Sequence, residues 1–181
     1  MTKLTNFLVL FLVLNFSSYS QNFLSTSGSS IVNENGDTII FRGMGLGGWM
    51  VQEGYMMAPG GFSSTQYQIK DRLIELIGEE ETDVFYNNWL SNHVRKIDID
   101  SMKQWGFNLI RVPIHYNLFT EPIENEPFPN AYTEKEIGFT LLDSLLSWCK
   151  QNQIYLMIDL HAAPGGQGYN ADISDYDPTK P

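Results

Sequence analysis

Hydrophobic and polar residues follow a short alternating pattern near the start of the chain. Asn35 and Gly36 lie between two β-branched runs, 31–32 and 38–41, and an Asn-Gly pair in that position is typical of a β-hairpin. The next segment, residues 44–50, is apolar and rich in glycine, which indicates a short strand that another backbone approaches closely.

From Ser64 onward the apolar residues recur every three or four positions, which is the period of a helix. The first predicted helix follows a cap at Ser63, Ser64 or Thr65 and ends at Gly78. A second covers residues 84–90, and a third runs from about Ile97 to Trp105 and ends at Gly106.

Two later segments are almost continuously apolar, as buried parallel strands are. They cover residues 107–112 and 154–160, and Pro113 stands at the end of the first. Between them, Thr133 and Glu136 form a capping-box pattern that predicts a helix through Trp148. Strands that alternate with helices indicate an α/β fold with a parallel sheet.

The chain offers three strands of this kind, at about 44–50, 107–112 and 154–160. A (β/α)8 TIM barrel has eight and typically about 250 residues. We therefore expect residues 21–181 to be the N-terminal portion of such a barrel, its first three βα units, preceded by a β-hairpin. A complete three-stranded domain is the alternative, and it would leave both edges of the sheet unpaired.

The first 20 residues have the layout of a secretory signal peptide. Lys3 precedes an apolar run, 7–16, and Ser18 and Ser20 are small residues suited to cleavage before Gln21. The run is too short to cross a bilayer comfortably, since a spanning helix needs about 20 residues. The sequence therefore predicts a secreted protein, extracellular or periplasmic, without stable membrane insertion after cleavage.

Composition excludes several classes of protein. Hydrophobic residues make up 43% of the chain and charged residues 18%, unlike a disordered chain, a collagen or a coiled coil. The net charge of −10 repels phosphate, so nucleic acid is not an expected partner. The single cysteine, Cys149, excludes an internal disulfide and a cysteine-based zinc site, and we expect it to be buried on a helix.

Polar residues follow each predicted strand. Because parallel strands gather chemistry at their carboxyl ends, we expect these residues to form one site. The first strand leads to Trp49, Glu53 and Tyr55. The second ends with Arg111 and is followed by His115 and Tyr116, and the third ends with Asp159 and His161. Each alone has an ordinary structural interpretation, but three strands that end alike favour a functional site.

Other chemistries have weaker support. Asp159 and His161 are two residues apart on one strand face, but the remaining histidines, His93 and His115, lie on different elements, so no metal is expected. No Gly-x-Ser-x-Gly nucleophile motif is present, and the glycines at 43–48 do not open a helix that could cradle phosphate. We expect no cofactor.

Three segments, RGMGLGGWMVQEGYM, DIDSMKQWGFNLIRVPIHY and IYLMIDLHAAPGGQ, closely resemble the first three strands of glycoside hydrolase family 5, the cellulase and exo-β-1,3-glucanase-like barrels. The resemblance covers about residues 23–176, and the Arg-x-Pro and Asp-Leu-His-x-x-Pro-Gly motifs are its most diagnostic parts.

The resemblance implies roles for individual residues. Arg111 would orient a nucleophilic carboxylate, and His161 would contact the hydroxyls of the sugar in the −1 subsite. Glu53 resembles the glutamate that holds the non-reducing sugar, and Gln167 matches the loop beside that subsite. His115 and Tyr116 complete the predicted substrate-binding set, while Trp49, Tyr55 and Tyr116 are candidates for stacking on sugar, with the barrel core as the alternative for Trp49.

The chain departs from the family in one respect. Retaining glycosidases need an acid/base and a nucleophile, both glutamates in family 5, and neither follows His161 in this sequence. Asn125-Glu126-Pro127 spells the family's acid/base motif, but it lies between the second and third strands, so we reject it.

We therefore expect a secreted, monomeric β-glucan hydrolase in the full-length protein and no activity in this chain alone. The alternative is a non-catalytic carbohydrate-binding module built from the half-pocket. The sequence does not determine which glycosidic linkage is cleaved or whether cleavage is endo or exo, although Glu53 favours exo action.

Overall fold

The computed structural model describes residues 24–58, 61, 63–166, 168, 175–177 and 179. The predicted signal peptide and Gln167 lie outside the described residues. The chain divides into two compact units, one ending at Ile40 and one beginning at Phe41. No helix among the described residues has the length and apolar character needed to span a bilayer.

The first unit contains strands β1 (Ser25–Ser27) and β2 (Ser30–Val32), which pair antiparallel. The predicted turn follows them: the Asn33 N–H donates to the Asp37 carbonyl at 3.0 Å. Beyond this turn the pairing reduces to a single bridge between Val32 and Thr38. The paired strands therefore precede the Asn-Gly turn, whereas we expected them on both sides of it.

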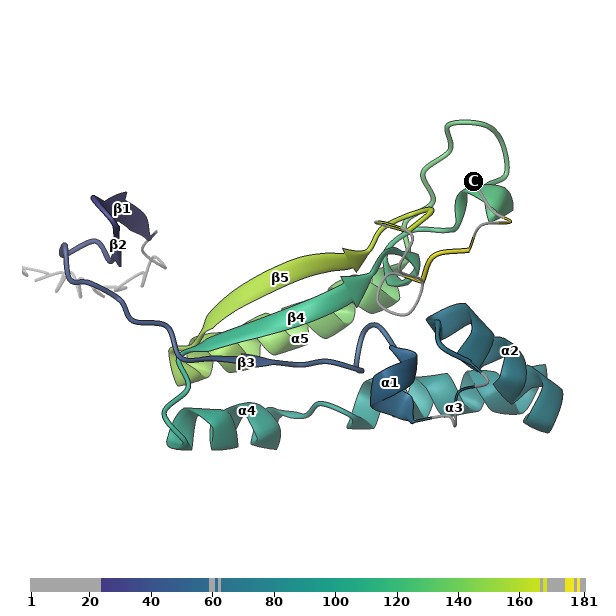
Figure 1. Cartoon of the computed structure of the whole chain (residues 1–181), viewed down its shortest axis with the longest axis horizontal. Helices are drawn as coiled ribbons and strands as arrows, with labels where there is room; N and C mark the ends of the chain where they lie inside the picture. The colour runs from purple at the N-terminus through teal and green to yellow at the C-terminus, as the bar shows by residue number, and fades with distance from the viewer. Residues whose placement is uncertain are drawn as a thin grey trace, which may run out of the picture. The chain divides into compact units, whose positions relative to one another are not determined.

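The second unit contains a parallel sheet and the helices that pack on it (Figure 1). Its elements are β3 (Gly43–Gly45), α1 (Gly54–Met57), α2 (Gln66–Ile77), α3 (Glu79–Asn92), α4 (Lys96–Gln104), β4 (Leu109–His115), the 3-10 helices η1 (Tyr116–Leu118) and η2 (Ile123–Asn125), α5 (Glu136–Asn152) and β5 (Tyr155–Ala162). The strand order is β3-β4-β5, with β4 central, and both pairings are parallel. The expected α/β fold with a parallel sheet is confirmed.

Alternate residues of β4 form the core between the sheet and the helices. Ile110 and Val112 are fully buried, and they pack in one cluster with Ile99 of α4 and with Leu145 and Cys149 of α5. Burial raises the pKa of the Cys149 thiol to about 11, so the predicted buried cysteine is confirmed. The intervening residues of β4 point to the opposite face of the sheet, because successive strand side chains alternate.

The predicted cap and end of α2 are confirmed. The Thr65 hydroxyl accepts a hydrogen bond from the Gln68 N–H at 3.3 Å, and the helix ends at Gly78. The capping box predicted at Thr133 and Glu136 is wrong, because α5 begins at Glu136 after Lys135, which provides no side-chain cap. The Thr133 N–H and hydroxyl instead donate to the Glu126 carboxylate at 2.8 and 2.7 Å.

The strand through Pro113 is longer than predicted, since β4 continues to His115. On the β3 side, the Arg111 carbonyl accepts from the Leu46 N–H at 2.9 Å, and the His115 N–H donates to the Met50 carbonyl at 3.1 Å. Pro113 lies between these two hydrogen bonds, opposite the turn at residues 47–49, where the segment after β3 leaves the sheet. A residue without an N–H is tolerated there because no ladder bond is lost.

Candidate active site

Arg111, Asp159 and His161 form a polar cluster on the sheet face that the helices leave open. A guanidinium nitrogen of Arg111 donates to the Asp159 carboxylate, and the same nitrogen lies 3.2 Å from His161 Nδ1. His161 Nδ1 also lies 3.0 Å from Asp159 Oδ2. The sequence prediction that Arg111 and His161 face a common space therefore agrees with their positions, and Asp159 joins them.

The contacts of His161 Nδ1 favour one tautomer. This nitrogen cannot donate to Asp159 and accept from Arg111 at the same time. We assign its proton to the bond with Asp159, because a carboxylate is the stronger, charged acceptor and Arg111 already donates to it. In a neutral ring, Nε2 is then left as a hydrogen-bond acceptor.

Glu53 lies on the other side of the His161 ring. It precedes α1 and is 3% exposed, and its Oε1 is 3.9 Å from His161 Nε2, too far for a direct hydrogen bond. Gly54 fixes this position: its N–H donates to the Ser64 carbonyl at 2.8 Å, and a Cβ there would lie 2.5 Å from the Ser64 Cα. The backbone contact therefore requires glycine directly after Glu53.

Tyr55 follows on α1 with most of its side chain exposed. Loss of solvent around its hydroxyl and the nearby Glu53 carboxylate, which accepts a hydrogen bond from it, raise the pKa of Tyr55. The phenol therefore stays neutral. Glu53 Oε1 and His161 Nε2 are thus two acceptors 3.9 Å apart, with the Arg111 cation nearby, an arrangement suited to neighbouring hydroxyl groups of a neutral ligand.

His115 belongs to a second, buried group. Its Nε2 lies 2.8 Å from Asp175 Oδ2, and its Nδ1 accepts from the Asn117 N–H at 3.2 Å. The other Asp175 oxygen accepts from the Tyr67 N–H at 2.9 Å. Both nitrogens of His115 are occupied and its side chain is 2% exposed, so it ties the end of β4 to the segment at 175–177 rather than to Arg111.

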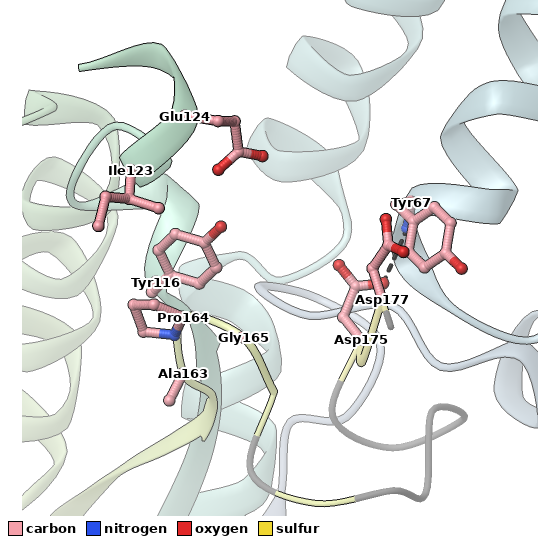
Figure 2. A pocket seen from close by; sticks show the side chains of 9 residues that line it. All are labelled: Tyr67, Tyr116, Ile123, Glu124, Ala163, Pro164, Gly165, Asp175 and Asp177. Carbon is pink, nitrogen blue, oxygen red and sulfur yellow. Dashed lines mark hydrogen bonds between the residues drawn. The ribbon is translucent and has the colours of Figure 1, made fainter. Parts of the chain in front are cut away.

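A small cavity of about 50 Å³ lies beside this second group. Figure 2 shows Asp175 and Asp177 next to Tyr67 on one side of it, and Tyr116 and Pro164 on the other. The Tyr116 ring stacks on His115 with centroids 5.0 Å apart. Tyr116 therefore lies at the carboxyl end of β4, as predicted, but within the His115 group.

Two further residues singled out in the sequence have structural contacts. Trp49 is 1% exposed, and its indole N–H donates to the Leu90 carbonyl at 2.9 Å, so it belongs to the core and not to a sugar-stacking surface. Glu126 of the Asn-Glu-Pro triplet is held by Thr133, as described above. Its rejection as an acid/base agrees with these contacts.

Sequence reasoning named Asp159 among the candidates at the strand ends but missed Asp175. Asp159 and His161 are two residues apart on one strand and so share a face. The sequence held no signal for Asp175, since it reaches His115 across 60 residues of sequence. Among the described residues, His, Cys, Asp and Glu side chains do not gather in groups of three that could hold a metal ion.

A parallel α/β sheet with a polar site at the carboxyl ends of its strands is the arrangement that α/β enzymes share. Residues 65–180 match the family model "Cellulase (glycosyl hydrolase family 5)". The match covers more than half of the sequence, and the chain belongs to this family.

Curated relatives are similar over most of this chain. It is 34% identical over 145 residues to a β-xylosidase of Phanerodontia chrysosporium, covering 80% of this chain and 29% of that protein. It is 33% identical over 130 residues to a probable glucan 1,3-β-glucosidase A of Aspergillus niger, covering 71% and 29%. The chain therefore spans less than a third of the length of these relatives.

Solved structures support the fold. The chain is similar to a rutinosidase from Aspergillus niger, with a TM-score of 0.55 and 20% identity, covering 74% of this chain and 36% of that one. It is also similar to the structure of AoRut, with a TM-score of 0.55 and 17% identity, covering 73% and 35%. At this identity the likeness concerns the architecture alone.

Proposed function

We propose that this chain supplies the first three βα units, and part of the sugar pocket, of a secreted (β/α)8 glycoside hydrolase that cleaves β-glucosidic bonds with retention. The observation that carries the proposal is the cluster of Arg111, Asp159 and His161 opposite Glu53, at the carboxyl ends of parallel strands. Membership of family 5 and the glucosidase names of the relatives support it. Export would depend on residues 1–20.

The pocket would bind the terminal sugar through paired acceptors. Glu53 Oε1 and His161 Nε2, 3.9 Å apart, would each accept a hydrogen bond from one of two adjacent hydroxyls. Because Glu53 is almost fully buried, the sugar chain would end against it, which favours exo action. Gln167 would border this subsite, and His115 and Tyr116 would support it from the end of β4.

Arg111 would act on the nucleophile. Its guanidinium would hold a glutamate carboxylate by a charge-assisted hydrogen bond and keep it ionised. Asp159 would keep the guanidinium in place for this. The nucleophile and the acid/base, separated by about 5–5.5 Å in retaining glycosidases, would come from later strands of the barrel. Residues 21–181 alone would then be inactive.

The test compares the natural polypeptide that carries these residues with a chain limited to 21–181. Reducing sugar released from laminarin, cellulose and an aryl β-glucoside is the first readout, and NMR of the first-formed anomer is the second. We expect turnover with the β-anomer formed first in the natural polypeptide, and its loss in Arg111→Ala. Turnover by residues 21–181 that vanishes in Arg111→Ala would refute the proposal, and so would an α-anomer as the first product.

A carbohydrate-binding module is the second candidate, because Glu53, Arg111 and His161 come together within this chain and could hold a sugar without cleaving it. Calorimetry of residues 21–181 with cello- and laminari-oligosaccharides distinguishes the two. Saturable heat without turnover in the natural polypeptide supports the module. Absence of heat from a folded sample eliminates it.

A further inference from the structure

A second, larger groove lies along the segment between β4 and α5. We define the β4–α5 groove as the space of about 620 Å³ lined mainly by residues 120–132, together with Tyr116 and Pro164. Its apolar wall exposes large side chains that a protein usually buries: Ile123, Phe128 and Tyr132 are 65%, 64% and 83% exposed. Large apolar groups gathered around one groove indicate a binding surface.

The segment that forms the groove is held by its own contacts. The Glu126 carboxylate accepts two hydrogen bonds from Thr133, and the Glu121 N–H donates to the Thr133 carbonyl at 2.9 Å. At the turn between the two aromatic residues, the Ala131 N–H donates to the Phe128 carbonyl at 3.1 Å. Phe128 and Tyr132 are therefore exposed on a braced scaffold, so a ligand would not have to order the loop first.

The groove is continuous with the candidate active site. Tyr116 directly follows β4, and Pro164 lies three residues after His161, so both line the groove from the strand ends that carry the polar cluster. Tyr116, Ile123 and Pro164 line the small cavity of Figure 2 as well. Glu53, Arg111 and His161 do not line the groove, so it extends the site rather than duplicating it.

The chemistry of the lining fits a neutral ring with one apolar face. The two carboxylates at the rim are already engaged, Glu126 by Thr133 and Glu121 by Lys135 at 3.5 Å. Apart from the neutral side chains of Thr120 and Asn130, what remains is aromatic and aliphatic surface. The net negative charge of the protein disfavours anions. The face of a β-linked glucosyl ring carries only C–H groups, while its hydroxyls lie at the edge, where an open groove leaves them in water.

We propose that the β4–α5 groove binds the glucosyl units on the leaving-group side of the cleaved bond, with Phe128 and Tyr132 as the residues that set the preference for longer substrates. This inference rests on the proposed function, which places the terminal sugar against buried Glu53. The rest of the substrate must leave the pocket away from Glu53, and the groove begins where β4 and β5 end.

The experiment uses the natural polypeptide and the double variant Phe128→Ala/Tyr132→Ala. Both side chains are exposed, so their removal leaves the core intact. Trp105→Ala is the matched control: Trp105 is 69% exposed and follows α4, at the opposite end of the strands. The assay compares kcat/KM among laminari- and cello-oligosaccharides of two to five units.

We expect kcat/KM to rise with chain length in the wild type and in Trp105→Ala. In the double variant the rise should fall by about tenfold, equivalent to about 1.4 kcal/mol. A rise with chain length that the double variant retains would overturn the inference and leave the proposed function intact, as would the absence of any rise.

Absence of turnover on every β-glycoside would instead count against the proposed function. In that case calorimetry with laminaripentaose and cellopentaose decides the inference separately. Heat that is lost in the double variant and kept in Trp105→Ala supports the groove as a β-glucan site. Absence of heat, or heat that the double variant keeps, overturns it.

Discussion

Replacing Asp159 by Asn tests whether the polar cluster is built for function or for stability. Asn keeps the size of the side chain but removes the charge that pairs with Arg111 and accepts from His161 Nδ1. Arg111 then loses its only carboxylate contact among the described ion pairs. The charged acceptor beside His161 Nδ1 is replaced by a neutral amide, which accepts more weakly and can also donate. Both groups are free to turn, while the strand pairing around them is unchanged.

The exposure of the pair sets the expected loss of stability. The side chains of Arg111 and Asp159 are 44% and 29% exposed, and ion pairs this accessible to water contribute about 0–1 kcal/mol. For a domain of this size, that corresponds to a fall in Tm of no more than about 4 °C. The effect on catalysis is expected to be larger, because a small misplacement of a positioning group can cost about 100-fold.

The assay measures urea unfolding and kcat/KM on the natural polypeptide, together with the ¹⁵N chemical shifts of the His161 ring. Asp100→Asn is the matched control, because Lys96 and Asp100 form an ion pair of similar exposure, 47% and 30%, on α4. We expect both variants to unfold at similar urea concentrations. Only Asp159→Asn should lose activity and shift the proton of the His161 ring away from Nδ1.

Two results would refute this reasoning. If Asp159→Asn keeps full kcat/KM, Asp159 does not position Arg111 for the reaction. If the ¹⁵N shifts of His161 in the wild type place the ring proton on Nε2, the assigned tautomer is wrong, and Nδ1 accepts from Arg111 instead.

Three further changes have defined outcomes. Gly138→Ala should cost about 1–3 kcal/mol in urea unfolding, because its Cβ would lie 2.6 Å from the Leu118 carbonyl oxygen. Burial raises the pKa of the Cys149 thiol from 9.0 to about 11, so the neutral thiol stabilises the fold fully below pH 9, and this stability is lost as the pH rises through 11. Over that range the free energy of unfolding should fall by about 3 kcal/mol more in wild type than in Cys149→Ala. Asp175→Ala leaves the buried His115 Nε2–H without its acceptor, which should cost about 1–3 kcal/mol in thermal unfolding.

Elements governed by local signals could be predicted from the sequence. Thr65 and Gly78 bound α2 through contacts within one helical turn, and the apolar runs at β4 and β5 reflect burial along the strand itself. Thr133 shows where this fails. Its capping pattern is local, but Thr133 instead donates two hydrogen bonds to the Glu126 carboxylate, seven residues away. That contact depends on the conformation of the loop, which a four-residue pattern does not predict.

The candidate site was only partly accessible for a related reason. The rule that chemistry gathers at the carboxyl ends of parallel strands brought Arg111 and His161 to one place from sequence alone. The same rule grouped His115 with them, because it does not say which face of the strand a residue occupies once pairing becomes irregular. Phe128 and Tyr132 were missed because hydrophobic residues do not recur at a regular spacing in the loop that carries them, so the sequence does not predict how the loop is arranged.

An irregularity in strand pairing explains why the two histidines separate. Arg111 pairs with Met157 and Pro113 with Asp159, so Arg111 and Asp159 share a face of the sheet. With regular pairing, His115 would lie opposite His161 on that face. Instead the register shifts after Ile114, and His115 pairs with Ala162. His161 is thus the extra residue of a bulge, a feature that re-aims side chains beside active sites. The shift leaves His161 with Asp159 and Arg111, and it leaves His115 to bind Asp175.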